Sequence, residues 1–209
     1  MPDPKNAVPE PKAQRNFTDM ESRIMADNSN KGAYIQGYNA QIVVDSKAQV
    51  ILAANLTQDT NDKRQLVPML QEAEENLLGE RPKMASADCG YHSETAVESP
   101  KLKGIDLYVP PDRMKHVEAD TKSQSQKECA KSMRAKLQTQ KGHDVYRMRK
   151  AIVEPVFGQI KEVRGLRAFL LRGLDAARAE WRIICLTHNL LKLYKCGGWS
   201  LLTMQFNPT

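Results

Sequence analysis

The order of strand-like and helix-like segments constrains the fold of this 209-residue chain more than any other feature. Residues 33–45 and 49–57 are rich in β-branched and aliphatic side chains, and a short polar link joins them. This pattern predicts an antiparallel hairpin. Apolar side chains then recur at helical spacing over residues 66–77, with Asp62 as the predicted N-cap and Gly79 as the stop. We therefore expect a helix directly after the hairpin.

A second unit of strand, helix and strand comes next. Residues 83–90 are small and mostly apolar and end in a glycine, as in a buried strand that runs into a loop. Ser93 predicts the N-cap of a helix that reaches Lys103, and residues 105–110 alternate in polarity before a Pro pair, which predicts another strand. The order β-β-α-β-α-β predicts an α/β fold with one mixed sheet.

The C-terminal third is predicted to be helical. Residues 133–162 and 174–195 show helical periodicity, and the second segment carries an apolar stripe with Trp181 and His188. We interpret His188 as a packed core histidine. Residues 112–130 show little periodicity and predict a linker. The predicted organisation is an extended Pro-rich arm at residues 1–16, one domain at residues 17–195 and a tail at residues 196–209.

Composition excludes several classes of protein. No stretch approaches the ~18 consecutive apolar residues of a membrane span, so we expect a cytoplasmic protein without membrane contact. Four cysteines without CxxC spacing predict free thiols rather than a disulfide framework or a zinc site.

Charge is distributed unevenly along the chain. Residues 131–195 carry 15 Lys and Arg against 5 Asp and Glu, a net charge of +10, whereas residues 1–130 carry 16 against 20. A cationic helical region can bind a polyanion such as nucleic acid, because each neutralised phosphate releases counterions. A solvated helix face explains the same charge, and both interpretations stay open.

Asp88 is the first candidate site residue. It stands near the carboxyl end of the predicted strand at residues 83–90, where the ligand-binding and catalytic groups of open α/β sheets gather. A cap for the following helix is the alternative role, but Ser93 already supplies that cap. His92 could contact a phosphate or a metal ion, although a loop histidine is more often a solvent-exposed residue.

Glu154 is the second candidate. It lies among apolar residues in the stretch 152–157, which is unfavourable for an unpaired carboxylate, so we expect a cationic partner. On a helix, Arg147, Glu154 and Lys161 fall on one stripe, and Lys150 lies one turn before Glu154. Spacing alone favours a structural ion pair over a catalytic site.

Several separated motifs resemble those of bacterial insertion-sequence transposases of the DDE type, in the family's order and over roughly residues 15–195. The motifs are Gly37-Tyr-Asn-Ala-Gln41 with Asp45, Asp88-Cys-Gly-Tyr91, Val153-Glu-Pro-Val-Phe-Gly-Gln-Ile-Lys161, Phe169-Leu-Leu-Arg-Gly173 and His188-Asn-Leu-Leu-Lys192. The resemblance implies a ribonuclease-H-like fold in which two Asp and one Glu hold two divalent metal ions that cut and rejoin DNA. Carboxylate oxygens suit Mg²⁺ or Mn²⁺, and a metal pair stabilises an in-line phosphoryl displacement.

The resemblance also assigns roles to residues. By position, Asp88 resembles the family's second Asp and Glu154 its Glu, which makes both expected metal ligands and catalytic residues. In the family's Tyr, Arg, Glu, Lys signature the Lys stands seven residues after the Glu, so Lys161 is the expected phosphate-positioning residue. DNA, at transposon ends and target, is the implied partner, and the candidate DNA-binding residues are Lys150, Arg164, Arg167 and Arg172.

Two signature positions depart from the family. The Arg expected four residues before Glu154 is Lys150, which can hold a phosphate as a point charge but without bidentate geometry. The Tyr expected seven residues before Glu154 is Arg147, with Tyr146 one position away.

The family's first Asp lies on the first, central strand of the sheet, upstream of the hairpin, where this chain has the Pro-rich arm. The available substitutes are Asp45, Asp59 and Asp62. The resemblance therefore implies an N-terminally truncated transposase whose mixed sheet lacks its first central strand. One alternative is a catalytically inactive remnant that binds DNA or an intact transposase. Another is a chain completed by an upstream polypeptide that supplies the strand. A homo-oligomer is a further expected partnership.

Overall fold

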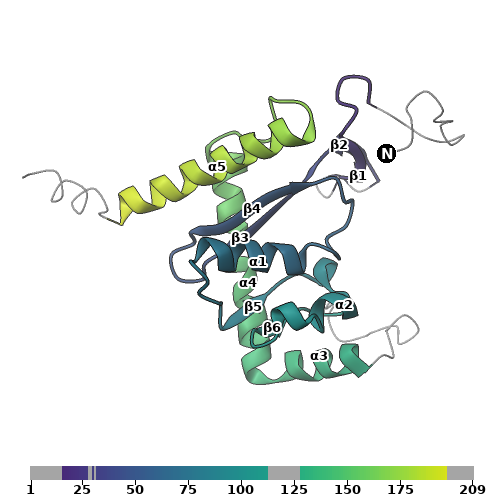
Figure 1. Cartoon of the computed structure of the whole chain (residues 1–209), viewed down its shortest axis with the longest axis vertical. Coiled ribbons are helices and arrows are strands. Elements are labelled where there is room, and N and C mark those ends of the chain that lie inside the picture. The colour runs from purple at the N-terminus through teal and green to yellow at the C-terminus, as the bar shows by residue number, and fades with distance from the viewer. Residues whose placement is uncertain (1–15, 28–29, 31, 113–127, 197–209) are drawn as a thin grey trace, which may run out of the picture.

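The computed structural model describes residues 16–27, 30, 32–112 and 128–196 (Figure 1). Nearly all of the predicted arm and tail, and most of the predicted linker, lie outside these residues. The elements in chain order are β1 (Arg23–Ala26), β2 (Tyr34–Gly37), β3 (Asn39–Val44), β4 (Ile51–Thr57), α1 (Leu66–Asn76), β5 (Met84–Ser86), the 3₁₀ turn η1 (Cys89–Tyr91), α2 (Glu94–Val97), the 3₁₀ turn η2 (Pro100–Leu102), β6 (Asp106–Tyr108), α3 (Glu128–Gln138), α4 (Gln140–Gly158), the π-helical turn η4 (Gln159–Val163) and α5 (Leu174–Lys195).

The described strands form three separate two-stranded sheets. β1 pairs with β2 and β3 pairs with β4, both antiparallel, whereas β5 pairs with β6 in parallel. The predicted hairpin is therefore present, and so are both strands of the predicted strand-helix-strand unit. The helix expected to reach Lys103 is instead the short α2 and the separate 3₁₀ turn η2, which Pro100 begins. The prediction of one mixed sheet is wrong for the described residues, because no backbone ladder joins β3–β4 to β5–β6. Helix packing and side-chain contacts hold these two sheets together instead.

The hairpin begins later than the sequence predicts. Residues 34–37 form β2, which pairs with β1, and β3 begins only at Asn39. At the break, the Tyr38 hydroxyl donates to Asp19, 2.8 Å from Oδ2, and the Tyr38 ring lies edge-on to Phe169 with the centroids 6.4 Å apart. These contacts fix the residue at which one sheet ends and the next begins.

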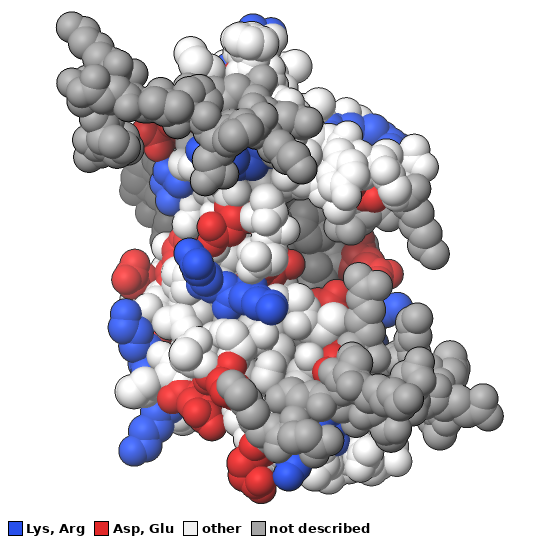
Figure 2. Space-filling model, turned by 90° about the vertical axis from the view of Figure 1, so that its right-hand side faces the viewer, with Lys and Arg blue, Asp and Glu red and all other residues white. Residues whose placement is uncertain are grey.

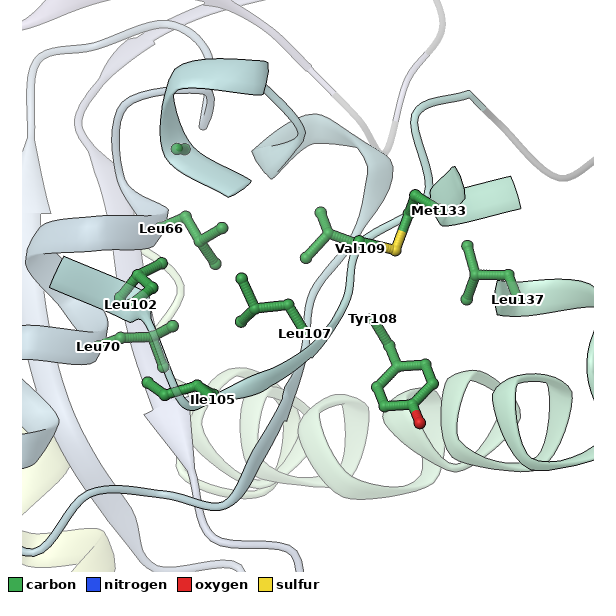
Figure 3. Close-up of a cluster of buried hydrophobic side chains, with 10 residues drawn as sticks. Leu66, Leu70, Leu102, Ile105, Leu107, Tyr108, Val109, Met133 and Leu137 are labelled. Carbon is green, nitrogen blue, oxygen red and sulfur yellow. The ribbon is translucent and has the colours of Figure 1, made fainter. Parts of the chain in front are cut away.

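A core lies where α1, β6 and α3 meet (Figure 3). Leu66 and Leu70 come from α1, Leu107 from β6, and Met133 and Leu137 from α3. Burial of each such side chain contributes about 1.5–3 kcal/mol relative to its exposure. This core fixes β6 and, through the parallel ladder, β5, whose carboxyl end leads to the turn that carries Asp88.

The hairpin strand β4 contributes to two further cores, because α1 and α5 both pack on it. Its contact with α1 is made by Ala53 against Met69 and Ala73. The core that it shares with the C-terminal helices consists of Ile51, Leu56, Val156, Ile160, Ala177, Trp181, Ile184 and Cys185.

Side chains also satisfy backbone groups of β4 that the hairpin leaves unpaired. Asn189 of α5 donates from Nδ2 to the Ile51 carbonyl and accepts the Ile51 N–H at Oδ1, each at 2.8 Å. Asn76 of α1 donates to the Leu52 carbonyl, also at 2.8 Å. Buried backbone groups need such partners, and here the two flanking helices provide them.

The long helix predicted from residue 133 is in fact two helices, α3 and α4. Thr139 caps α4, and its Oγ1 accepts the Gly142 N–H at 3.0 Å. A Cβ at Gly142 would lie 2.1 Å from the carbonyl oxygen of Lys136, so only glycine allows this close approach. The last predicted helix is confirmed as α5. No helix in the described part of the chain is long and apolar enough to cross a membrane.

Candidate active site

Asp88 lies just beyond the carboxyl end of β5, at the start of the turn η1. Its Oδ1 accepts the Cys89 N–H at 2.7 Å, so the carboxylate caps this turn. Ser93 caps the next helix, α2, by accepting the Ala96 N–H, as the sequence predicts. The Asp88 side chain is 52% exposed, and the carboxylate is therefore accessible to a ligand from solvent.

Arg149 of α4 faces Asp88. Its Nη2 lies 3.9 Å from Asp88 Oδ2, at the outer limit of an ion pair, and the guanidinium carbon lies 5.3 Å from the centroid of the Tyr146 ring. The Arg149 side chain is only 15% exposed, and its Nε is buried with no hydrogen-bond partner among the described residues. The Nη2 side of the guanidinium, which faces the accessible Asp88, is the part suited to an anionic oxygen brought by a ligand.

Arg149 is a site residue that the sequence reasoning missed. Arg147 and Lys150, which stand at the signature distances before Glu154, are exposed on α4, and among the described residues the cation that faces Asp88 is Arg149. Tyr146 and Arg149 instead keep the three-residue step from Tyr to Arg that the signature requires. That preserved step is the signal that could have identified them.

Glu154 is exposed on α4 rather than enclosed by apolar side chains. Val156, two residues later, is the residue of this stretch that enters the core. The cationic partner expected for Glu154 is not found in the part of the chain that the structure describes. Lys161 lies beyond the end of α4 in the π-helical turn η4, with Nζ 5.4 Å from the centroid of the Phe157 ring. The regular helical stripe that was expected to join Glu154 to Lys161 is therefore interrupted.

Asp62 does not cap α1. That helix begins at Leu66 and has no side-chain cap. Asp62 Oδ1 instead accepts hydrogen bonds from Asn39 Nδ2 and Gln41 Nε2, each at 2.7 Å. Gln41 in turn accepts the hydroxyl proton of Tyr91, the last residue of the turn that Asp88 begins. Burial, followed by the charges of Asp62 and Asp88, raises the pKa of Tyr91 well above its usual value, so this hydroxyl stays a donor.

The other two substitutes for a first Asp have structural roles. Asp45 closes the hairpin turn, because its Oδ2 accepts the N–H groups of Lys47 and Ala48 at 3.0 and 2.6 Å. Asp59 accepts a hydrogen bond from Gln65 Nε2 at 2.9 Å. Among the residues that the structure describes, no three Asp, Glu, His or Cys side chains gather closely enough to hold a metal ion.

The two candidate histidines differ in environment. His188 is 1% exposed and lies between the Gln159 side chain and the Gln49 carbonyl, 3.0 Å from Nε2, which confirms a core histidine. Burial lowers its pKa. His92 is half-buried rather than solvent-exposed, and burial lowers its pKa as well.

The arginines predicted to contact DNA divide into two groups. Arg164 donates to the Ile184 carbonyl at 3.0 Å and to Thr187, and thereby ties η4 to α5. Arg167 and Arg172 are exposed, and Arg167 pairs with Glu162. On the face drawn in Figure 2, the described Lys and Arg lie in separate groups among Asp and Glu rather than in one continuous patch.

Comparison with known proteins assigns the chain to a family. The family model of the transposase DDE domain matches residues 8–190, which is most of the chain. No curated protein and no solved structure was found to match. The match covers both strands of the hairpin, the Asp88 turn, and helix α4 with Arg149 and Glu154. The chain therefore belongs to the family of transposase DDE domains.

Proposed function

We propose that this chain is the catalytic-domain portion of a DNA transposase that moves an insertion sequence by metal-dependent cleavage and transfer of DNA strands. In this proposal its strands and helices form a ribonuclease-H-like unit. The observation that carries it is the accessible Asp88 carboxylate at the carboxyl end of a parallel strand, faced by the nearly buried Arg149, in a chain that a transposase domain matches over residues 8–190.

The donor chemistry of the site fits a hard divalent cation. Asp88 is accessible and uses only Oδ1 in capping the turn, while Glu154 is exposed. In the proposed function Asp88 and Glu154 hold Mg²⁺ or Mn²⁺, because such ions prefer carboxylate oxygens. When bound, the ions supply an activated nucleophile and stabilise the leaving oxygen of a phosphodiester.

The chain's own cations orient the DNA in this proposal. The Arg149 guanidinium, whose Nη2 faces the accessible Asp88 carboxylate, donates to a phosphate held beside it. Four exposed cations contact phosphates along the DNA backbone and position it: Lys150, Lys161, Arg167 and Arg172. Arg164 acts indirectly, because its guanidinium holds η4 against α5.

A second candidate function is DNA binding without cleavage, in which the chain is an inactive relative that occupies transposon ends or pairs with an intact transposase. The net charge of +10 over residues 131–195 favours it, as does the lack of a metal-ligand trio in the described ranges. The two functions differ in whether Asp88 binds a divalent ion.

Calorimetric titration of Mn²⁺ into the full chain tests this difference. We expect binding in the wild type and its loss in both Asp88→Asn and Glu154→Gln. Asp144→Asn is the matched control, since this carboxylate lies on α4 and is 51% exposed, close to the exposure of Asp88. Equal Mn²⁺ binding in wild type, Asp88→Asn and Glu154→Gln would contradict the site. A folded wild type that binds no Mn²⁺ but binds DNA would establish the second function.

A further inference from the structure

The turn η1, which Asp88 begins, follows β5, and β5 and the hairpin strands belong to different sheets. No backbone hydrogen-bond ladder joins these two sheets among the described residues. Both strands of the parallel pair are only three residues long. The position of Asp88 relative to the hairpin therefore depends on side chains that cross between the two sheets. Among the described residues, the hydrogen bond between β3 and η1 is the one from the Tyr91 hydroxyl to Gln41.

Gln41 sits in β3 with 2% of its surface exposed, and every polar group of its carboxamide is engaged. Nε2 donates to Asp62 Oδ1 at 2.7 Å and to Asn39 Oδ1 at 2.8 Å, and the carbonyl oxygen accepts the Tyr91 hydroxyl. Because a carboxylate only accepts, the amide nitrogen must face Asp62 and the carbonyl must face Tyr91. Asp62 thus fixes the direction in which Gln41 presents its acceptor.

Asp62 also approaches the turn η1 directly, in addition to its link through Gln41. A Cβ added at Gly90 would lie 3.1 Å from Asp62 Oδ2, so the carboxylate packs closely on the backbone of the turn. Within the turn, the Tyr91 N–H donates to the Asp88 carbonyl at 3.0 Å, and the Cys89 N–H donates to the Asp88 carboxylate. Tyr91 and Asp88 are therefore the two ends of one short hydrogen-bonded unit.

We propose that Gln41, oriented by Asp62, is a positioning residue that places Asp88 in the active site by holding the Tyr91 hydroxyl. The proposal rests on the proposed function, in which Asp88 binds a divalent ion. Partners that orient a metal ligand from behind change metal affinity by about 10- to 100-fold when they are removed. Gln41 and Tyr91 act on Asp88 through the backbone of the turn, because the Tyr91 N–H donates to the Asp88 carbonyl, and neither contacts the ion.

The test measures the Mn²⁺ affinity of the full chain by electron paramagnetic resonance. Urea denaturation first establishes that each variant has the same free energy of unfolding as wild type. Tyr91→Phe removes only the hydroxyl, and Gln41→Met keeps the length of the side chain but removes its hydrogen bonds. We expect each to weaken Mn²⁺ binding about 10-fold. Tyr38→Phe is the matched control, because it removes a tyrosine-to-carboxylate bond, that to Asp19, away from the Asp88 turn. Wild-type Mn²⁺ affinity in both Tyr91→Phe and Gln41→Met would overturn the proposal.

A second measurement reports on the turn without a metal. Cys89 adjoins Asp88 and is half-buried, whereas Cys196 is exposed at the end of α5 and serves as an internal reference. Alkylation by iodoacetamide, followed peptide by peptide with mass spectrometry, should be several-fold faster at Cys89 in Tyr91→Phe and unchanged at Cys196. Failure of the wild type to bind Mn²⁺ would contradict the proposed function alone. An unchanged Cys89 rate would contradict the positioning role.

Discussion

At the scale of single residues, Arg149 combines two roles that can be separated. Its stem and guanidinium are nearly buried beside the Tyr146 ring, while its charge faces Asp88 at 3.9 Å. An ion pair with a half-exposed carboxylate contributes about 0–1 kcal/mol, whereas the apolar stem of an arginine contributes through packing. Packing should therefore dominate the effect of Arg149 on stability.

Replacing Arg149 tests this division. We expect Arg149→Met to stay within about 1 kcal/mol of wild type in its free energy of unfolding, because methionine fills most of the space. Arg149→Ala should lose about 1–3 kcal/mol through the lost packing. Urea denaturation followed by circular dichroism measures both, and an equal loss in the two variants would show that the charge matters more.

The sequence identifies site residues only where their role is local. Asp88 could be predicted because a carboxylate at the end of a short apolar strand has a position that neighbouring residues reveal. The roles of Asp62 and Gln41 could not, since the two are 21 residues apart and Gln41 and Tyr91 are 50 apart. An N-cap is the commonest use of an Asp before a helix, and here a long-range hydrogen bond displaced it.

At the scale of elements, a charge cluster attaches β6 to the helices that follow it. Asp106 at the start of β6 contacts Lys136 of α3 at 2.5 Å and Lys141 of α4 at 3.0 Å, and the Tyr108 hydroxyl donates to it at 2.9 Å. Hydrogen bonds from Lys136, then Lys141, hold the pKa of Asp106 well below its ordinary value of 3.8.

This pKa shift predicts a pH dependence of stability. A carboxyl group whose pKa is lower in the folded state stabilises the protein above its unfolded pKa, and that contribution is lost as the pH falls below about 4. Asp106→Asn should therefore lose less unfolding free energy than wild type between about pH 5 and pH 2. Asp175→Asn, which removes a carboxylate that is 96% exposed, is the control for the loss of one acidic group. Parallel curves for Asp106→Asn and wild type would contradict the expected linkage.

Some element boundaries could be predicted from the sequence and others could not. The hairpin, α1 and α5 follow hydrophobic periodicity, which is a property of neighbouring residues. The strand β1 has only four residues, and its pairing with β2 depends on where Tyr38 is anchored by Asp19. The break between α3 and α4 depends on the approach of Gly142 to Lys136, a contact made only once the two helices have packed.

At the scale of the whole molecule, cationic charge is concentrated in the C-terminal helices but partly neutralised on the surface. Arg167 is paired with Glu162, and on the face drawn in Figure 2 basic and acidic groups lie among one another. Polyanion binding at such a surface depends on a few exposed cations rather than on total charge. Of the predicted DNA-binding arginines, Arg167 and Arg172 remain accessible.

Binding of duplex DNA as a function of salt concentration tests these cations. The slope of log K against log salt changes by about 0.9 for each phosphate contact removed, so the double variant Arg167→Ala/Arg172→Ala should reduce it by about 2. Lys47→Ala, an exposed cation in the hairpin turn, should leave the slope unchanged. Fluorescence anisotropy with a labelled duplex measures the slope, and an unchanged slope in the double variant would exclude both arginines from the phosphate contact.

The two hydrogen bonds between Asn189 and Ile51 have a consequence for the behaviour of the protein in a crowded solution. The Asn189 carboxamide offers Ile51 the same donor and acceptor that an adjoining strand would offer, so the N–H and carbonyl of Ile51 are already bonded. A strand of another molecule therefore cannot add to the hairpin at this part of the β4 edge. The next carbonyl, that of Leu52, is bonded by Asn76. Asn189 and Asn76 thereby keep this stretch of the β4 edge from pairing with a strand of another molecule.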